Sequence, residues 1–222
     1  MPPALPSAVV CGSQTIPPSH DFLSCLRFHL THDPDLEVLV EAVYELPGLW
    51  SRLVEDNSLL NRIPSELPAS LNHWISNSEF AFDIPATLPN VLLAPLTVII
   101  HVVQYVQYLK HFISEDAHSH IRDSVRHGGF QGLCTGFLSA TALACSTTKK
   151  DIARNAAVAM RLAMCIGAYV DLDQTGTGDD STAMACFVVQ WGPGCPREEV
   201  VQILKHYPEV SPKARVCFKN QH

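Results

Sequence analysis

The sequence predicts a mixed α/β fold. A short apolar stretch near the N-terminus is typical of a buried strand, and long segments with apolar residues three and four positions apart predict helices. A Gly-x-Cys-x-Gly pentapeptide at 132–136 has the pattern of a sharp turn between a strand and a helix. With 222 residues, 47% of them hydrophobic, the chain is long enough for one substantial domain with a real core.

The first expected elements are a strand and two helices. Residues 8–11, Ala-Val-Val-Cys, predict the strand, and the Gly-Ser-Gln-Thr that follows is a turn signal. Apolar residues at helical spacing predict one helix over 21–31, with Ser19 as its candidate N-cap, and a second helix over 35–45. The Pro-Gly pair at 47–48 should break or kink that second helix.

The middle of the chain predicts short helices followed by one long apolar helix. Residues 58–89 are rich in Pro, Asn and Ser, which favours short helices and loops. Residues 84–108 carry no formal charge and so imitate a membrane span. Pro95 and His101 interrupt that stretch, and a buried helix over 91–113 explains it without a membrane. We expect His101 to be a core histidine with a hydrogen-bond partner.

A polar connection over 114–127 precedes the pentapeptide. We interpret His118 and His120 as solvated side chains, because no third ligand stands in register with them to complete a metal site. His127 is close in sequence to the pentapeptide but lies on the segment that enters it. A general base must reach the thiol at hydrogen-bond distance, so His127 is poorly placed for that role.

The pentapeptide Gly132-Leu133-Cys134-Thr135-Gly136 has the form of a nucleophile elbow with cysteine in the place of serine. Its glycines are expected because a Cβ at either position would collide with backbone. Cys134 would stand at a helix N-terminus, where unpaired N–H groups and the helix dipole favour a thiolate nucleophile. A buried, small packing residue is the alternative, because cysteine is often buried.

Two helices are predicted after the elbow. The pattern is helical from 137 to about 169, with a break near 146–148. Thr147 or Thr148 could cap the second of these helices, which should start at Lys149.

A polar, Gly-rich loop at 173–180 marks the best candidate domain boundary. We therefore place the large subdomain over 1–178 and the start of a smaller unit over 179–222. The smaller unit reads as β-α-β and looks unfinished, since the sequence stops directly after a strand. Its expected elements are a strand over 182–191, a helix over 196–207 and a strand over 214–218.

Charge and cysteine usage exclude some classes of protein. The net charge is -7, and no cluster of Lys and Arg is interleaved with aromatic residues, which argues against a nucleic-acid surface. Eight cysteines are scattered without Cys-x-x-Cys spacing, as in proteins that keep reduced thiols. The opening Met-Pro-Pro-Ala-Leu-Pro has no basic region and is not expected to be a signal peptide. We expect a cytoplasmic protein outside the membrane.

These residues resemble the starter unit acyltransferase domain at the N-terminus of fungal non-reducing polyketide synthases. The resemblance covers essentially the whole chain, and order and spacing agree. It rests on four stretches: Cys11-Gly12-Ser13-Gln14-Thr15, the elbow Gly132 to Gly136, Arg161-Leu162-Ala163-Met164-Cys165-Ile166-Gly167-Ala168, and Trp191-Gly192 followed by Arg197-Glu198-Glu199-Val200.

The resemblance implies a fold and a reaction. The fold would be an α/β-hydrolase-like acyltransferase core with a ferredoxin-like small subdomain, incomplete in this sequence. Cys134 would take an acyl group from acyl-CoA or a fatty acyl carrier and pass it to the phosphopantetheine thiol of an acyl carrier protein. The backbone amides of Thr135 and Gln14 would stabilise the oxyanion. No cofactor is expected to stay bound, since acyl-CoA and the phosphopantetheinyl carrier are substrates.

Two departures from the family pattern concern specificity and activity. Ile166 precedes Gly167 where malonyl-specific relatives carry an arginine before the glycine that ends the helix, which favours an uncharged acyl group. Arg161 lies five residues earlier and on a different face of the helix. In the family the general base is a histidine that follows the small subdomain, and the resemblance assigns no residue of this sequence to that role.

Two alternatives remain beside the transferase. One is a catalytically silent remnant that binds a carrier or another chain through an unpaired sheet edge. The other is a cysteine hydrolase similar to dienelactone hydrolases, which use the same elbow followed by an Asp and a His. The candidates for those two residues are Asp171, Asp173, Asp179, Asp180, His206 and His222.

Overall fold

The computed structural model describes residues 4–13, 18–77, 88–112, 114, 116–175 and 202. The chain divides into two units, Met1–Ser181 and Thr182–His222. All of the elements below belong to the first unit. The predicted β-α-β segment lies outside the described residues, apart from residue 202 within it.

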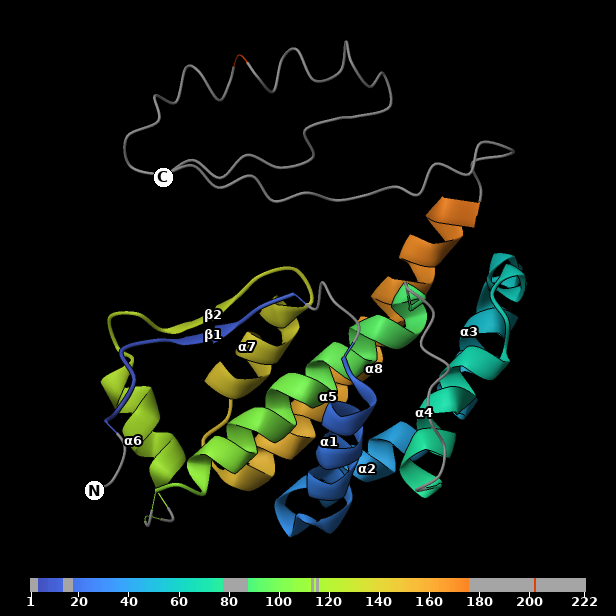
Figure 1. Ribbon diagram of the computed structural model, residues 1–222. Helices are drawn as coiled ribbons and strands as arrows, with labels where there is room; N and C mark the ends of the chain where they lie inside the picture. The colour runs from blue at the N-terminus through green and yellow to red at the C-terminus, as the bar shows by residue number, and fades with distance from the viewer. Residues whose placement is uncertain are drawn as a thin grey trace. The chain divides into compact units, whose positions relative to one another are not determined.

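Helices make up most of the described part of the first unit (Figure 1). The early elements are α1 (His20–His32), the 3-10 helix η1 (Pro34–Leu36), α2 (Glu37–Tyr44), α3 (Leu46–Asp56), the 3-10 helix η2 (Ser58–Arg62) and α4 (Glu66–Ser76). The later helices are α5 (Asn90–Leu109), α6 (Ala117–Ser124), α7 (Gly136–Ala144) and α8 (Lys149–Thr175).

Local signals explain where several of these helices begin. The Ser19 hydroxyl accepts a hydrogen bond from the Phe22 amide at 3.2 Å, which confirms the predicted cap of α1. Pro47 occupies the first turn of α3, where the missing N–H costs nothing, so the predicted break becomes a new helix. Thr148 caps α8, because its Oγ1 accepts from the Asp151 amide at 3.2 Å while Asp151 Oδ2 accepts from the Thr148 amide at 3.0 Å.

The long apolar helix α5 forms the centre of the core. Among the described residues, α5 and residues 149–172 of α8 are long and apolar enough to cross a membrane by length and composition. The most apolar window of α5 is 72% buried inside the protein, however, which is the environment of a core helix. This agrees with the predicted buried helix, and Pro95 is accommodated within it.

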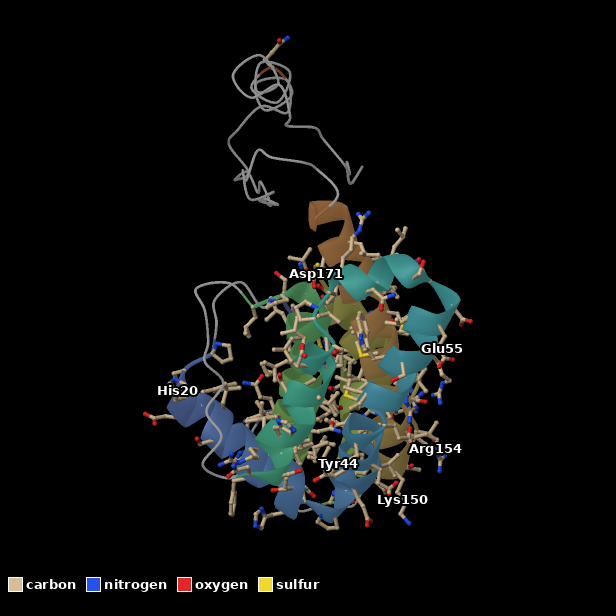
Figure 2. The ribbon with its side chains drawn as sticks, turned by 90° about the vertical axis from the view of Figure 1, so that its right-hand side faces the viewer. His20, Tyr44, Glu55, Lys150, Arg154 and Asp171 are labelled. Atoms are coloured by element: carbon tan, nitrogen blue, oxygen red, sulfur yellow. The ribbon has the colours of Figure 1, made fainter. Side chains whose placement is uncertain are left out.

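α8 runs alongside α5 and is fastened to its first turn (Figure 1). Asp171 accepts hydrogen bonds from the backbone amides of Asn90, at 2.9 Å, and Val91, at 2.8 Å. A Cβ on Gly167 would overlap the Asn90 backbone, so only glycine permits this approach. Gly167 lies inside α8, which continues to Thr175, beyond the predicted end of the helical pattern at about residue 169. Figure 2 shows Lys150 and Arg154 pointing outward near the other end of α8.

The described strands form a two-stranded parallel sheet. β1 (Val9–Cys11) pairs with β2 (Phe130–Gly132), with Val9 opposite Phe130 and Cys11 opposite Gly132. β1 confirms the first predicted strand. Parallel neighbours need a long crossover, and here it contains every helix from α1 to α6. The described fold is thus a mostly helical α/β arrangement with a small parallel sheet.

The polar connection before the elbow is partly helical, contrary to expectation. α6 buries Ala117, His118 and Ile121, a face too narrow to stand out in the sequence. His118 is 2% exposed, so the prediction that it is solvated is wrong, whereas His120 is exposed. The Nε2 of His118 donates to the Ser146 carbonyl at 3.0 Å, which leaves Nδ1 to accept from the Tyr105 hydroxyl at 2.8 Å. Burial lowers the pKa of His118.

Candidate functional site

The predicted elbow is present as a strand, a tight turn and a helix. β2 ends at Gly132 and α7 begins at Gly136. The turn is closed by hydrogen bonds from the Gly136 amide to the Leu133 carbonyl, at 2.9 Å, and from the Phe137 amide to the Cys134 carbonyl, at 3.0 Å. Cys134 has a φ of 54°, and no other non-glycine residue in the described part has a positive φ. That left-handed conformation costs an L-residue about 1–2 kcal/mol.

Both glycines of the pentapeptide are required by close backbone contacts. A Cβ on Gly132 would overlap the first turn of α7 at Phe137, and one on Gly136 would overlap the Cys11 carbonyl. The strand β1 also holds the turn directly, because the Leu133 amide donates to the Cys11 carbonyl at 3.0 Å. The predicted collision at both glycines is therefore confirmed.

The Cys134 side chain is exposed, which excludes the alternative of a buried packing residue. Its Sγ lies 4.0 Å from the Thr135 hydroxyl. Leu133 and Phe137, one residue before and three residues after Cys134, are 49% and 62% exposed, so apolar side chains are exposed on both sides of it in the sequence. Within the described part of the chain, the Thr135 amide donates no hydrogen bond. Gln14, the other predicted oxyanion donor, lies outside the described residues.

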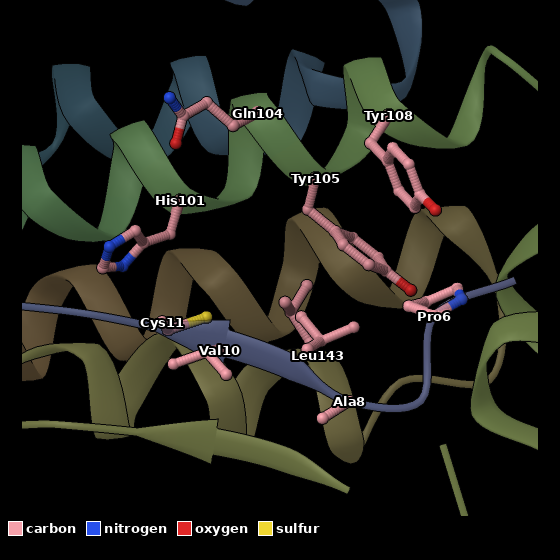
Figure 3. Close-up of a pocket in the computed structure, with 10 residues that line it drawn as sticks. Pro6, Ala8, Val10, Cys11, His101, Gln104, Tyr105, Tyr108 and Leu143 are labelled. Carbon is pink, nitrogen blue, oxygen red and sulfur yellow. The ribbon is translucent and has the colours of Figure 1, made fainter. Parts of the chain in front are cut away.

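A row of polar and aromatic side chains on α5 faces the sheet. His101, Gln104, Tyr105 and Tyr108 follow the i, i+3, i+4, i+7 spacing of one helix face, a signal that our reading of the sequence missed. Figure 3 shows His101 and Tyr105 projecting from α5 toward β1. A cavity of about 290 Å³ lies there, lined by Pro6, Ala8, Val9, Val10, Cys11, His101, Gln104, Tyr105, Tyr108 and Leu143.

His101 is half-buried in the wall of this cavity and bonded to the helical arm of the elbow. Its Nδ1 lies 3.0 Å from the hydroxyl of Ser139, which is fully buried on α7. Burial lowers the pKa of His101, so the neutral imidazole is favoured. The expectation of a core histidine with a partner is confirmed.

Cys11 also lines this cavity, and it differs from the exposed Cys134 in being buried. Cys11 ends β1 and is 4% exposed. Burial raises the pKa of its thiol to about 11, because a thiolate would lose its hydration there. Cys11 is thus unsuited to act as a nucleophile at neutral pH.

Neither His127 nor His118 lies at the elbow. His127 is exposed in the segment that enters β2, at the opposite end of that strand from Cys134. His118 is engaged by Tyr105 and Ser146, as described above. Among the described residues, no group of three or more His, Cys, Asp and Glu side chains could hold a metal ion.

Three other singled-out residues have defined places on or near α8. Ile166 lies on α8 and is 48% exposed. Arg161 pairs with Glu45 of α2's C-terminal cap. Asp171 is committed to the amides of α5, which removes it as the acid of a hydrolase triad. The side chain of Asp173 and all of Asp179, Asp180, His206 and His222 lie outside the described part.

A short strand, a tight turn with an exposed cysteine and a helix that begins two residues later have the arrangement expected of a nucleophile elbow. Residues 86–215, more than half of the chain, match the family model described as "Starter unit:ACP transacylase in aflatoxin biosynthesis". The chain therefore belongs to the starter unit:ACP transacylase family.

The curated relatives are fungal polyketide synthases. The chain is 53% identical to a non-reducing polyketide synthase, esdpA, of Penicillium shearii over 94% of its own length and 9% of that protein. It is 49% identical to the non-reducing polyketide synthase spyA of Aspergillus fumigatus, over 95% of the chain and 12% of the relative. Triacetic acid lactone synthase cle1 of Aspergillus versicolor is 41% identical over 94% and 13%. The chain thus spans about a tenth of the length of these relatives.

Proposed function

We propose that this chain is a starter unit acyltransferase whose nucleophile is Cys134. The observation that carries the proposal is the left-handed, exposed cysteine between β2 and α7, because an elbow in this strained conformation has no value for packing. Strained backbone of this kind concentrates at functional sites, where the surrounding structure maintains it. Family membership supplies the class of reaction.

In the proposed reaction the Cys134 thiolate attacks the carbonyl carbon of an acyl thioester. The new C–S bond forms first and gives a tetrahedral oxyanion, which collapses as the bond to the donor sulfur breaks, and the donor leaves as a thiolate that takes up a proton. A phosphopantetheine thiol of an acyl carrier protein then reverses these steps and receives the acyl group. Both steps exchange one thioester for another, so they demand a good nucleophile more than a strong base.

The oxyanion that forms during each step needs backbone donors. We assign this role to the amides of Thr135 and Gln14. The Thr135 amide follows Cys134 directly and donates no hydrogen bond to any described residue, which supports the first assignment. No general base is assigned, since in the described part no histidine is hydrogen-bonded to Cys134.

The substrate proposed is an uncharged acyl group carried by acyl-CoA or a fatty acyl carrier. The exposed apolar side chains of Leu133 and Phe137, which flank Cys134 in the sequence, support this, as does the exposed Ile166 on α8. A carboxylated acyl group would call for a guanidinium partner. We further propose that the described part is an α/β-hydrolase-like core, that residues 179–222 begin a ferredoxin-like subdomain, and that the protein works in the cytoplasm with its thiols reduced.

The test is acyl transfer to the protein itself. Incubation with acetyl-CoA or hexanoyl-CoA should add one acyl group to the intact mass, and peptide mapping should place it on Cys134. Cys134→Ala should abolish the adduct, whereas Cys25→Ala, which removes an exposed cysteine on α1, should retain it. Absence of the adduct from the wild type, or an equal adduct on Cys134→Ala, would refute the proposal.

A further inference from the structure

The helical arm of the elbow packs through small side chains. The buried face of α7 consists of Gly136, Ser139, Ala140, Ala142 and Leu143. Helices lock their relative rotation mainly by fitting side-chain ridges into grooves, and small residues offer shallow ridges. Close approach is therefore easy for α7, but apolar packing alone fixes its rotation poorly. A directional contact is needed.

Ser139 provides such a contact. It lies one turn beyond Gly136, the first residue of α7, and its side chain is fully buried. A buried hydroxyl is costly unless it has a hydrogen-bond partner. Here the partner is Nδ1 of His101, 3.0 Å away on α5.

His101 is distinct from the other members of its face. Tyr105 of the same face uses its hydroxyl on His118 of α6, away from the elbow helix. Figure 3 shows the His101 ring beside Cys11, at the end of β1 that also receives the Leu133 amide. His101 therefore reaches α7 close to where the strand arm of the elbow is held.

We propose that His101 is a positioning residue for Cys134, acting through Ser139 on the rotation of α7. This rests on the proposed role of Cys134 as nucleophile. The strand arm of the elbow is fixed by pairing with β1, and the helical arm by the His101–Ser139 hydrogen bond. Since the φ of 54° at Cys134 is unfavourable in itself, freeing the helical arm lets the turn relax and takes the thiol out of its exposed position.

The experiment measures the rate at which iodoacetamide labels Cys134 relative to Cys25, an exposed thiol on α1 that serves as an internal reference. His101→Leu removes the hydrogen bond and should slow the relative labelling of Cys134 about fivefold, the factor for one ordinary hydrogen bond. His101→Asn places an amide at the same number of bonds from Cα as Nδ1, so it should stay within about twofold of the wild type.

A purely structural role for His101 predicts a different outcome. Equal slowing in His101→Leu and His101→Asn, or no slowing in His101→Leu, overturns the proposal. If His101→Leu does not fold, Ser139→Ala decides, since it deletes the same contact by removing a single oxygen. Unchanged relative labelling in Ser139→Ala then overturns the proposal, and slowing of about fivefold supports it.

The labelling assay needs no acyl donor, so it separates the two proposals. A wild type that forms no thioester refutes the transferase function even where the labelling series behaves as expected. A wild type that forms the thioester with an unresponsive labelling series refutes only the role of His101.

Discussion

The two strands of the described sheet each lead to a cysteine, and the two cysteines have opposite properties. Cys11 ends β1, is almost completely buried and has a pKa raised by burial to about 11. Cys134 follows β2 by two residues, is exposed and has a left-handed backbone. The two segments are joined, because Cys11 O accepts the hydrogen bond of the residue before Cys134.

The comparison teaches that residue type alone does not make a reactive thiol. Cys11 lines the cavity together with residues of α5 and belongs to the hydrophobic core. After β2 the chain must turn within four residues to begin α7, and two glycines allow that turn to lift its central side chain into solvent. Backbone geometry and burial therefore determine which of the two thiols is accessible for reaction.

Thiol labelling should show the largest difference between the two cysteines. At pH 8 a thiol of pKa about 11 is about 0.1% thiolate, so Cys11 should react about a hundredfold or more slowly than an ordinary exposed cysteine. Timed iodoacetamide labelling with peptide mapping measures this. Comparable rates for Cys11 and Cys134 in the folded protein would contradict the comparison.

Gly136→Ala should disrupt the close contact between the start of α7 and the end of β1, on which the different environments of Cys11 and Cys134 depend. The new Cβ overlaps the Cys11 carbonyl, which can move only if β1 or α7 shifts, at a cost of about 2–3 kcal/mol. Gly12→Ala is the matched control, because a Cβ on that neighbouring glycine meets nothing within 4 Å. Urea denaturation of both variants gives the free energies of unfolding, and equal losses would show that the close contact is not real.

The same substitution should have opposite effects at the two cysteines. Cys134→Gly relieves the left-handed strain and should stabilise the protein by about 0.5–1 kcal/mol after the entropic cost of glycine. Cys11→Gly removes a buried side chain from a strand and should destabilise it by about 1–2 kcal/mol. Thermal unfolding of the pair measures the difference, and destabilisation in both would argue against strain at Cys134.

The buried His118 should make the free energy of unfolding depend on pH, and this is the smallest of the four predicted effects. Burial lowers the pKa of His118 in the folded protein, so the unfolded chain binds more protons below its ordinary value of 6.5. The free energy of unfolding should therefore fall as pH drops below about 6.5. The hydrogen bond to the Ser146 carbonyl and the charge of Asp151 act against this lowering of the pKa, and the charge of Arg122 acts with it.

His118→Gln should flatten this pH dependence without abolishing it, because burial lowers the pKa of His101 as well. His120→Gln, exposed on the same helix, is the matched control and should keep the wild-type profile. Denaturation midpoints measured between pH 5 and 7, on both sides of the ordinary pKa of histidine, give the slope. A wild-type slope in His118→Gln would show that the buried imidazole does not contribute.

Elements with strong local signals were predicted correctly from the sequence. Ser19, the Pro47–Gly48 pair and Thr148 set helix boundaries through contacts within a few residues. α5 was predicted because its apolar length exceeds what a surface helix shows. α6 was missed, since its stability comes from burying His118 against Tyr105 and Ser146, which are distant in sequence.

The site was predicted unevenly for the same reason. Cys134 and its two glycines form one local motif, which a pentapeptide can reveal. The hydrogen bond between His101 and Ser139 joins α5 to α7, and the local sequence of neither helix predicts it. The role of Asp171, a candidate acid in the hydrolase alternative, was likewise set by distant residues, because its carboxylate caps the backbone amides at the start of α5.

The sequence by itself determined the elbow, the glycines it needs and the family to which the chain belongs, because these depend on short, contiguous patterns. Only the tertiary structure decided that Cys134 is exposed while Cys11 is buried, that His118 is a core residue, and that His101 reaches the elbow helix. Burial and hydrogen-bond partners are properties of segments brought together by packing, so no local pattern encodes them.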